Sequence, residues 1–409
     1  MSKLKKLIAG LLATCALGTA AMAYTAPLGF SIFPYTPVTQ PVVNLTDTVN
    51  ELLALINAQT MPSNLVITPP GGRLSLTSVV GGVPTGDVAL ESNVFYMPYD
   101  TELLPVYNGT AWQYVDFGPA GMQLTLGSVD TSQTVGGTEA LYDVYGFLNG
   151  GSPTICKVAW GGTTRSTTAG GGANGTGGTQ NVAIAQLNGI WTNKVAMATA
   201  NCYGGTGTSA SNTPVSYVFG ANQGTLLGTI SLPNPGGISQ LCKGGTAALL
   251  SAAGGLNSAG VNVSNVYNRV PINCSNLDNA LTTSSSTSWA AMGNHDAISW
   301  VDSIGQTSAI YVANVQAAAA GGTAAMSAEV GVAYASNSPL VSTTAPVIIG
   351  ASNPATSTLA SNWQTVTTSE AENPVAGLNT IWLEKASGAG TASYGLNSNG
   401  IGLNLSIMY

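Results

Sequence analysis

The chain has 409 residues, of which only 7 % are charged and 51 are glycine, and its formal net charge is −7. Globular proteins usually carry about 25 % charged residues, so the composition is atypical of a cytosolic enzyme. It is typical of an exported β-rich surface solvated by hydroxyl and amide groups. With 10 basic against 17 acidic residues, the chain lacks the basic face that phosphate contacts require, so nucleic acid is excluded as an expected partner.

Residues 1–23 have the pattern of a secretory signal peptide. Residues 3–6 contain three lysines, residues 7–17 form an apolar run too short to cross a bilayer, and residues 21–23 read Ala-Met-Ala, a small-x-small cleavage site. We expect cleavage after Ala23 and an exported, extracellular or virion-surface location. A lipoprotein signal ending at Cys15 is the weaker alternative, because threonine precedes that cysteine.

Residues 24–65 predict an extended, proline-rich segment and a short helical stem, Leu45–Ala58. Thr48 and Glu51 have the spacing of a capping box. Isolated helices shorter than about 12–15 residues are marginal in water, so the apolar stripe must pack on the β-rich part of the chain or on copies of itself. We expect the second, which makes the protein a homo-oligomer. The residues of this oligomerisation stripe are Leu45, Val49, Leu52, Leu53 and Ile56.

The rest of the chain predicts short strands separated by turns, and we divide it into a β-rich domain at 66–262 and a sandwich-like domain at 263–409. Two hairpins are clearest: residues 106–112, with Asn108-Gly109 at the tip, and residues 142–165, with Asn149-Gly150-Gly151 at the turn. The fold class is therefore all-β, with β-sandwich or jelly-roll-like domains. The other predicted strands are 73–80, 93–99, 122–126, 215–219, 225–232, 288–292, 297–301, 309–316, 328–335, 380–385 and 401–409. We expect Ala317–Gly322 to be a turn of small residues.

Four cysteines remain once Cys15 is removed with the signal. An even number in an exported chain indicates two disulfides, for which three connectivities are open, and the spacing matches no zinc site. We expect Cys242 to pair with Cys274, and four free buried thiols remain the alternative. The candidates are Cys156, Cys202, Cys242 and Cys274.

Several segments follow one another in a recognisable order. They are Gly72–Thr77, Phe95–Tyr99, Tyr107–Trp112, Tyr142–Trp160 with Thr163–Arg165, Leu227–Ile230, Asn265–Val270, the region of Trp289, Trp382–Glu384, Tyr394–Gly395 and Gly400–Leu403. Together they resemble the tail-fibre-like or virion surface proteins of tailed phages and prophages, a group of unassigned role. The resemblance covers most of Gly71–Tyr409.

This resemblance implies a β-rich structural or receptor-contacting protein without catalysis, and the analogy with fibres favours a trimer. The chain departs from the group in its secretory signal and in insertions at Asn193–Ser216 and Pro233–Val261. Those departures leave both a phage particle and a cell surface open as its location. The resemblance identifies no functional residue.

Sequence motifs for catalysis are weak. His295, the only histidine, is followed by Asp296, but the chain has no nucleophile elbow to accompany them and no metal-ligand spacing. Asp130, Glu139 and Asp143 form the nearest group of acids, so a secreted carbohydrate-active enzyme is an alternative. We therefore expect no catalytic, cofactor-binding or metal-binding residues.

Aromatic side chains are the candidates for ligand contact, because a flat ring with a polar edge can stack on a sugar. The expected partner is a cell-surface glycan or receptor, although most of these rings also suit a core or a cross-strand pair. The candidate stacking residues are Tyr96, Tyr99, Tyr107, Trp112 and Trp160.

The last nine residues, 401–409, alternate in hydrophobicity and end in tyrosine, as the closing strands of outer-membrane barrels do. An outer-membrane β-barrel is therefore a second alternative. Glycine- and serine-rich tracts interrupt most other segments, so too few strands alternate in this way, and we expect no membrane partner.

Overall fold

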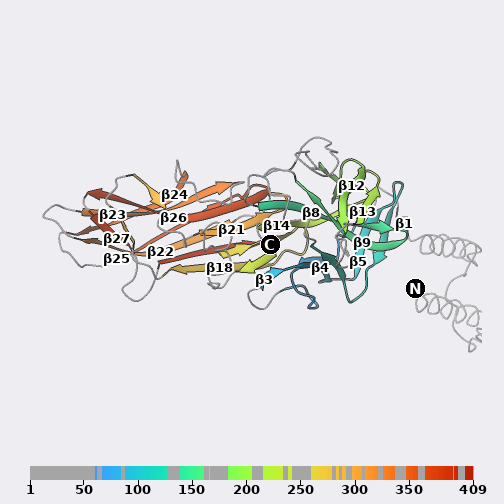
Figure 1. Ribbon diagram of the computed structural model, residues 1–409, viewed down its shortest axis with the longest axis horizontal. Coiled ribbons are helices and arrows are strands. Elements are labelled where there is room, and N and C mark those ends of the chain that lie inside the picture. Colours follow the sequence, from blue (N-terminus) through green and yellow to red (C-terminus); the bar gives the residue numbers. More distant parts are fainter. Residues whose placement is uncertain are drawn as a thin grey trace, which may run out of the picture. The chain divides into compact units, whose positions relative to one another are not determined.

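The computed structural model describes residues 60–61, 67–83, 88–126, 139–160, 165, 183–204, 215–233, 238–241, 259–278, 282–284, 288–291, 297–305, 309–320, 326–336, 347–357, 364–389, 391–394 and 401–408. Every regular element in these residues is a β-strand, so the fold is all-β as predicted (Figure 1). The predicted signal peptide and the helical stem with its stripe lie outside the described residues. By its contacts the chain divides into two compact units, Met1–Asn57 and Ala58–Tyr409, and all described strands belong to the second.

Two small sheets come from the first part of the chain. One has the order β1-β6-β5 and the other β2-β4-β7. Their strands are β1 (Thr60–Met61), β5 (Leu103–Tyr107), β6 (Trp112–Asp116), β2 (Gly72–Ser75), β4 (Asn93–Pro98) and β7 (Met122–Thr125).

The first large sheet has the order β10-β11-β14-β8-β9-β12-β13, with β17 paired to β14. Its strands are β8 (Glu139–Asn149), β9 (Ser152–Ala159), β10 (Ile184–Leu187), β11 (Ile190–Asn193), β12 (Met197–Gly204), β13 (Val215–Phe219), β14 (Thr225–Pro233) and β17 (Val263–Asn265). The β8–β9 hairpin confirms the predicted turn: Asn149 pairs with Ser152, and Gly150 and Gly151 have φ of 57° and 90°.

The second large sheet has the order β24-β23-β26-β21-β16-β15-β3, with β20 paired to β26. Its strands are β3 (Val88–Glu91), β15 (Ile238–Leu241), β16 (Ala259–Val261), β20 (Ala290–Ala291), β21 (Ala297–Asp302), β23 (Met326–Ser336), β24 (Val347–Ser357) and β26 (Gly377–Ala389). β16 and β21 pair in parallel, so main-chain pairing crosses the domain boundary predicted after residue 262.

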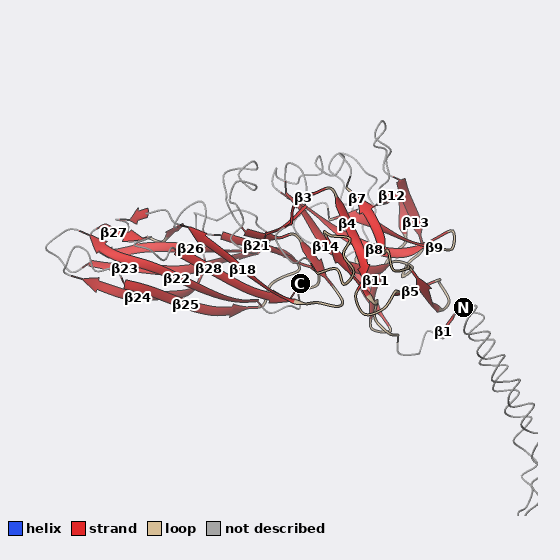
Figure 2. Cartoon of the chain, turned by 90° about the horizontal axis from the view of Figure 1, so that it is seen from below, coloured by secondary structure: helices blue, strands red, loops and turns tan. Residues whose placement is uncertain are grey.

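A six-stranded sheet of order β18-β28-β22-β27-β19, with β25 on β22, completes the fold. Its strands are β18 (Pro271–Asp278), β19 (Thr282–Ser284), β22 (Ala309–Ala320), β25 (Gln364–Glu372), β27 (Thr391–Tyr394) and β28 (Ile401–Met408). β22 contacts β23 and β24 of the second large sheet, which gives a sandwich-like arrangement (Figure 2). The turn predicted at Ala317–Gly322 is wrong, because Ala317–Ala320 continue β22 and pair with β27.

β8 is buried on both faces, and this places it at the centre of the first large sheet. Tyr142 and Val144 face one core, which Leu74, Leu104 and other residues of the two small sheets complete. Tyr145 and Phe147 face a second core built with β9, β12 and β13. Burying each large apolar side chain contributes about 1.5–3 kcal/mol to the stability of the fold. Because residues of β8 face both cores, this one strand links the packing of the small sheets to that of the first large sheet.

A candidate recognition surface

The five predicted stacking residues have different environments. Tyr96, Trp112 and Trp160 are buried, which corrects the prediction that they contact a ligand. Tyr107 is partly buried and its ring packs against Trp112, with centroids 5.6 Å apart. Only Tyr99 of the five is largely exposed, with 46 % of its side chain accessible.

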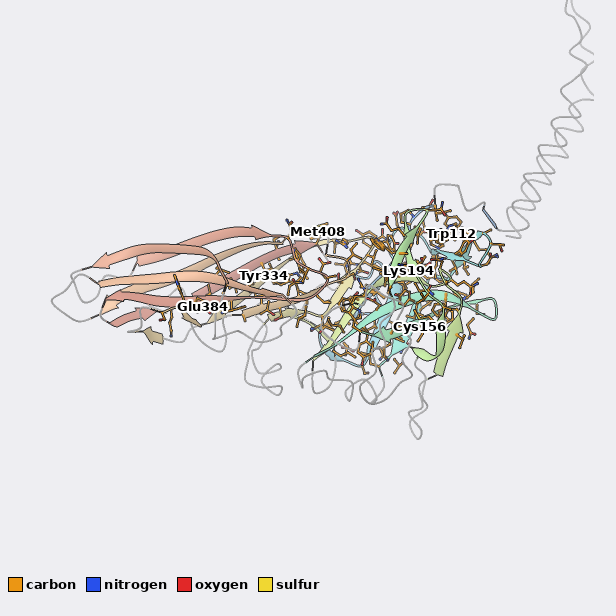
Figure 3. The ribbon with its side chains drawn as sticks, turned by 90° about the horizontal axis from the view of Figure 1, so that it is seen from above. Trp112, Cys156, Lys194, Tyr334, Glu384 and Met408 are labelled. Atoms are coloured by element: carbon orange, nitrogen blue, oxygen red, sulfur yellow. A yellow bond between two sulfur atoms is a disulfide. The ribbon has the colours of Figure 1, made fainter. Side chains whose placement is uncertain are left out.

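The buried rings have structural partners. The hydroxyl of Tyr96 accepts a hydrogen bond from the backbone N–H of Gly72 at 3.1 Å, and burial raises the pKa of this hydroxyl far above its ordinary value. Trp112 Nε1 donates to Asn188 Oδ1 at 3.2 Å. Trp160 packs in a cluster with Leu141 and Val301. Figure 3 labels Trp112, along with Cys156 of the first large sheet.

Tyr99 lies on a turn after β4 that is fixed to Gly71, the residue before β2. The carbonyl oxygen of Gly71 accepts hydrogen bonds from the backbone N–H groups of Tyr99, Asp100 and Thr101, at 3.0, 2.7 and 3.1 Å. The N–H of Gly71 in turn donates to the carbonyl of Leu103 at 2.9 Å. The backbone that presents the tyrosine ring is therefore held from both sides.

Arg73 supports the tyrosine ring from within the protein. Its side chain is fully buried, and its guanidinium carbon lies over the Tyr99 ring at 5.6 Å from the centroid. Gly82 covers the aliphatic part of Arg73: it has φ of 59°, and a Cβ there would approach Arg73 Cγ to 2.7 Å. Glycine at this position allows the loop to close over the arginine.

An apolar turn lies beside Tyr99. The N–H of Gly82 donates to the carbonyl of Val79 at 2.9 Å, and the N–H of Gly81 donates to the carbonyl of Pro98 at 3.0 Å. Val79, Val80 and Val83 are 58 %, 74 % and 38 % exposed. We call Val79, Val80, Val83 and Tyr99 the Tyr99 patch. These are four of the eight exposed large apolar residues in the described part of the chain, and clustering of this kind marks interaction surfaces.

Acidic residues border the patch. Asp100 is exposed and Glu102 is partly exposed, and among the described residues neither side chain has an ion pair or a hydrogen bond. Arg73 is buried, so the charge that this border presents to solvent is negative.

Asp143, one of the predicted acidic cluster, has a structural partner. Arg165 Nε donates to Asp143 Oδ2 at 2.8 Å, Arg165 Nη2 donates to Oδ1 at 2.6 Å, and Thr229 Oγ1 donates to Oδ1 at 2.7 Å. Burial lowers the pKa of Arg165, but the charge and hydrogen bonds of Asp143 outweigh it, so the pKa is raised. Glu139 begins β8, whereas Asp130 and His295 lie outside the described residues.

Glu384 is a second buried carboxylate, on β26, and the sequence did not indicate it. Trp382 Nε1 donates a hydrogen bond to Glu384 Oε1, and Oε2 has no partner among the described residues. Burial raises the pKa of Glu384 to about 7, although Trp382 and Lys385 favour the charged form. Figure 3 labels this side chain.

Cys156 of β9 and Cys202 of β12 form a buried disulfide, with their Cα atoms 5.5 Å apart. Cys274 of β18 is disulfide-bonded as well. The Cys242–Cys274 pairing stays a prediction, since Cys242 lies outside the described residues.

No three His, Cys, Asp or Glu side chains gather as metal ligands within the described residues. In the same part of the chain, no helix has the length and apolar character that crossing a bilayer requires.

Sequence reasoning missed the exposed valines of the patch. The alternation over residues 73–80 predicted one strand, but β2 ends at Ser75 and the chain then turns. The signal that was available is Val79-Val80-Gly81-Gly82-Val83, in which two adjacent valines meet a glycine pair that favours a turn.

No protein-family model and no curated protein matches the chain. Two solved structures are similar at 9 % identity: the VP2 protein of infectious bursal disease virus, as a D431N mutant in T=1 particles, and the mosquito-larvicidal Cry4Aa toxin of Bacillus thuringiensis. Their TM-scores are 0.22 and 0.17. The matches cover 84 % of this chain and 71 % of VP2, and 85 % of this chain and 54 % of the toxin. Likenesses this weak carry no argument about function.

Proposed function

We propose that this chain is a non-enzymatic structural and surface-recognition protein, tail-fibre-like or virion-associated, that contacts a glycan or another cell-surface partner. The observation that supports this most directly is the Tyr99 patch, in which two adjacent turns held by backbone hydrogen bonds expose an aromatic ring and three valines. Exposed apolar residues that gather in one place mark contact surfaces, whereas scattered ones do not, so the exposure of these four residues on two adjoining turns favours a contact role.

Binding of the labelled full chain to intact bacterial cells tests this function. We expect Tyr99→Ala combined with Val80→Ser to abolish most of the binding, because the ring and the most exposed valine are removed together. Val218→Ser is the matched control, since Val218 is 62 % exposed but belongs to β13 rather than to the patch. Equal binding by the patch variant and the control contradicts the proposal.

We further propose that the protein works as a homo-oligomer, with a trimer favoured by the fibre analogy and Leu45–Ala58 as the stem. Light scattering on the full chain measures the mass of the particle. We expect Leu52→Gln combined with Leu53→Gln to reduce it to that of one chain, since polar residues in the stripe disfavour association. A single-chain mass for the unsubstituted protein removes this part of the proposal.

A further inference from the structure

We infer that the Tyr99 patch binds the C–H face of an uncharged sugar ring. This inference rests on the proposed function and specifies the class of its ligand.

The size of the patch fits a small ligand better than a protein. A stable protein–protein interface buries about 800 Å² on each partner and involves roughly 20–30 residues a side. The patch consists of four exposed residues on two short segments, Val79–Val83 and Tyr99. A single sugar ring is comparable in size to the Tyr99 ring, and the exposed valines on the adjoining turn add apolar surface.

The chemistry beside the ring fits a polyhydroxylated ligand. Asp100, next to Tyr99, is exposed and unpaired among the described residues, and Thr101 is exposed as well. A carboxylate accepts hydrogen bonds from hydroxyl groups, while the aromatic face receives the C–H groups of the same ring. Backbone hydrogen bonds therefore fix Tyr99, Asp100 and Thr101 on one turn, so that an aromatic ring and two exposed oxygen-bearing side chains are adjacent along the chain.

The solvent-exposed charge beside the patch disfavours anionic ligands. Asp100 and Glu102 repel carboxylates, sulfates and phosphates, and Arg73, which contacts the ring, is buried away from solvent. An anionic membrane would attract basic residues, and the described border of the patch presents none. Uncharged sugars are neither repelled by the acidic residues nor dependent on basic residues for binding, so they are the ligand class that fits this charge pattern.

The backbone requires little ordering on binding. Three N–H groups fix the Tyr99 turn on the carbonyl of Gly71, and Gly81 ties the valine turn to Pro98. Sites that are ordered before binding avoid the entropic cost that flexible loops carry. A weak contact with one sugar ring is therefore measurable, above all where several copies of the chain bind one polymer.

The test is co-sedimentation or calorimetric titration of the full chain with neutral polysaccharides: dextran, mannan and galactan. Polygalacturonate and phosphatidylcholine vesicles serve as the anionic-glycan and lipid probes. We expect at least one neutral polysaccharide to bind, and Tyr99→Ala to weaken this binding by roughly tenfold, the size of one lost aromatic contact. Tyr99→Phe should keep it, Asp100→Asn should weaken it, and Val218→Ser should leave it unchanged.

Several results overturn the inference: no binding to any neutral polysaccharide, Tyr99-dependent binding of polygalacturonate or vesicles, or a lower oligomeric mass for Tyr99→Ala. The last would make the patch an interface between copies of the chain. If Tyr99→Ala loses cell binding while no neutral polysaccharide binds, the sugar assignment fails and the proposed recognition function stands. Since Tyr99 is 46 % exposed, its variants are expected to fold, which thermal unfolding checks.

Discussion

Arg165 and Asp143 make a two-point contact in the interior of the first large sheet, with Nε 2.8 Å from Oδ2 and Nη2 2.6 Å from Oδ1. Both side chains are less than one-tenth exposed. Thr229 joins them from β14, directly opposite Asp143 in the register. The guanidinium carbon of Arg165 also lies 4.4 Å from the centroid of the Trp160 ring. Arg165 thus donates hydrogen bonds to the buried carboxylate of Asp143 and packs its guanidinium group on the buried ring of Trp160.

Replacing Arg165 by methionine should lower the free energy of unfolding by about 3–5 kcal/mol, because Asp143 is left as a buried charge without a counter-ion. Chemical denaturation measures the loss. The double variant Arg165→Met with Asp143→Leu should be more stable than Arg165→Met alone, since no charge is then stranded. Lys194→Met, an exposed lysine, is the control, and a similar loss there would contradict the explanation.

Glu384 should make stability fall as pH rises. Burial raises its pKa from 4.5 to about 7, so between these pH values the folded protein holds a proton that the unfolded chain releases. The associated stability is complete below about pH 4.5 and is lost through about pH 7, on the order of 3 kcal/mol in total. Glu384→Gln should remove this slope. Denaturation curves from pH 4 to about pH 8 compare the two proteins, and equal slopes would refute the assignment.

The disulfide between Cys156 and Cys202 should hold the β12–β13 hairpin on the sheet. The two cysteines are separated by 46 residues, and β12 pairs with β9 only at Tyr203 and Lys157 within the described residues. Replacing both cysteines by alanine should cost about 2–4 kcal/mol. Hydrogen exchange should quicken in β12 and β13 more than in β5 and β6, which act as the internal control. Uniform exchange over all four strands would disprove the local role.

Replacing Asn265 should lower the stability of the protein more than replacing a typical asparagine side chain. Its buried amide accepts a hydrogen bond from the N–H of Leu74 at 2.6 Å and donates to the carbonyl of Leu74 at 3.2 Å. Asn265→Ala leaves two buried backbone groups unsatisfied, which costs roughly 2–6 kcal/mol. Gln186→Ala, an exposed amide on β10, should change stability little. Thermal unfolding of both variants tests the contrast, and a small effect at Asn265 would count against it.

The strand content and the hairpins could be predicted from the sequence, because they depend on residues that are adjacent along the chain. Asn149-Gly150-Gly151 favours a hairpin turn, and Tyr142 to Phe147 alternate toward two cores. The error at Ala317–Ala320 has the same origin: small residues suggest a turn locally, but four partners on β27 extend the strand. Local pattern is outweighed there by pairing with a distant segment.

The candidate site could not be predicted as well from the sequence, because the solvent exposure of a side chain depends on contacts with residues far away along the chain. Tyr96 and Tyr99 are three residues apart and look alike in sequence, yet one is in the core and the other is on the surface. The difference comes from Gly71, whose carbonyl turns the backbone after Pro98. Likewise Asn265 reaches Leu74 over 191 residues, a partnership that no local signal indicates.

The second large sheet determines when the chain can complete its folding. β3 comes early in the chain, β15, β16 and β21 follow between residues 238 and 302, and β26, which joins β21 to β23 and β24, is completed only at Ala389. A nascent polypeptide therefore keeps the edge of β21 that pairs with β26 open until nearly all of the chain has been synthesised, and open edges invite aggregation. Cutting the gene after codon 262 would accordingly yield two incomplete sheets rather than two usable domains.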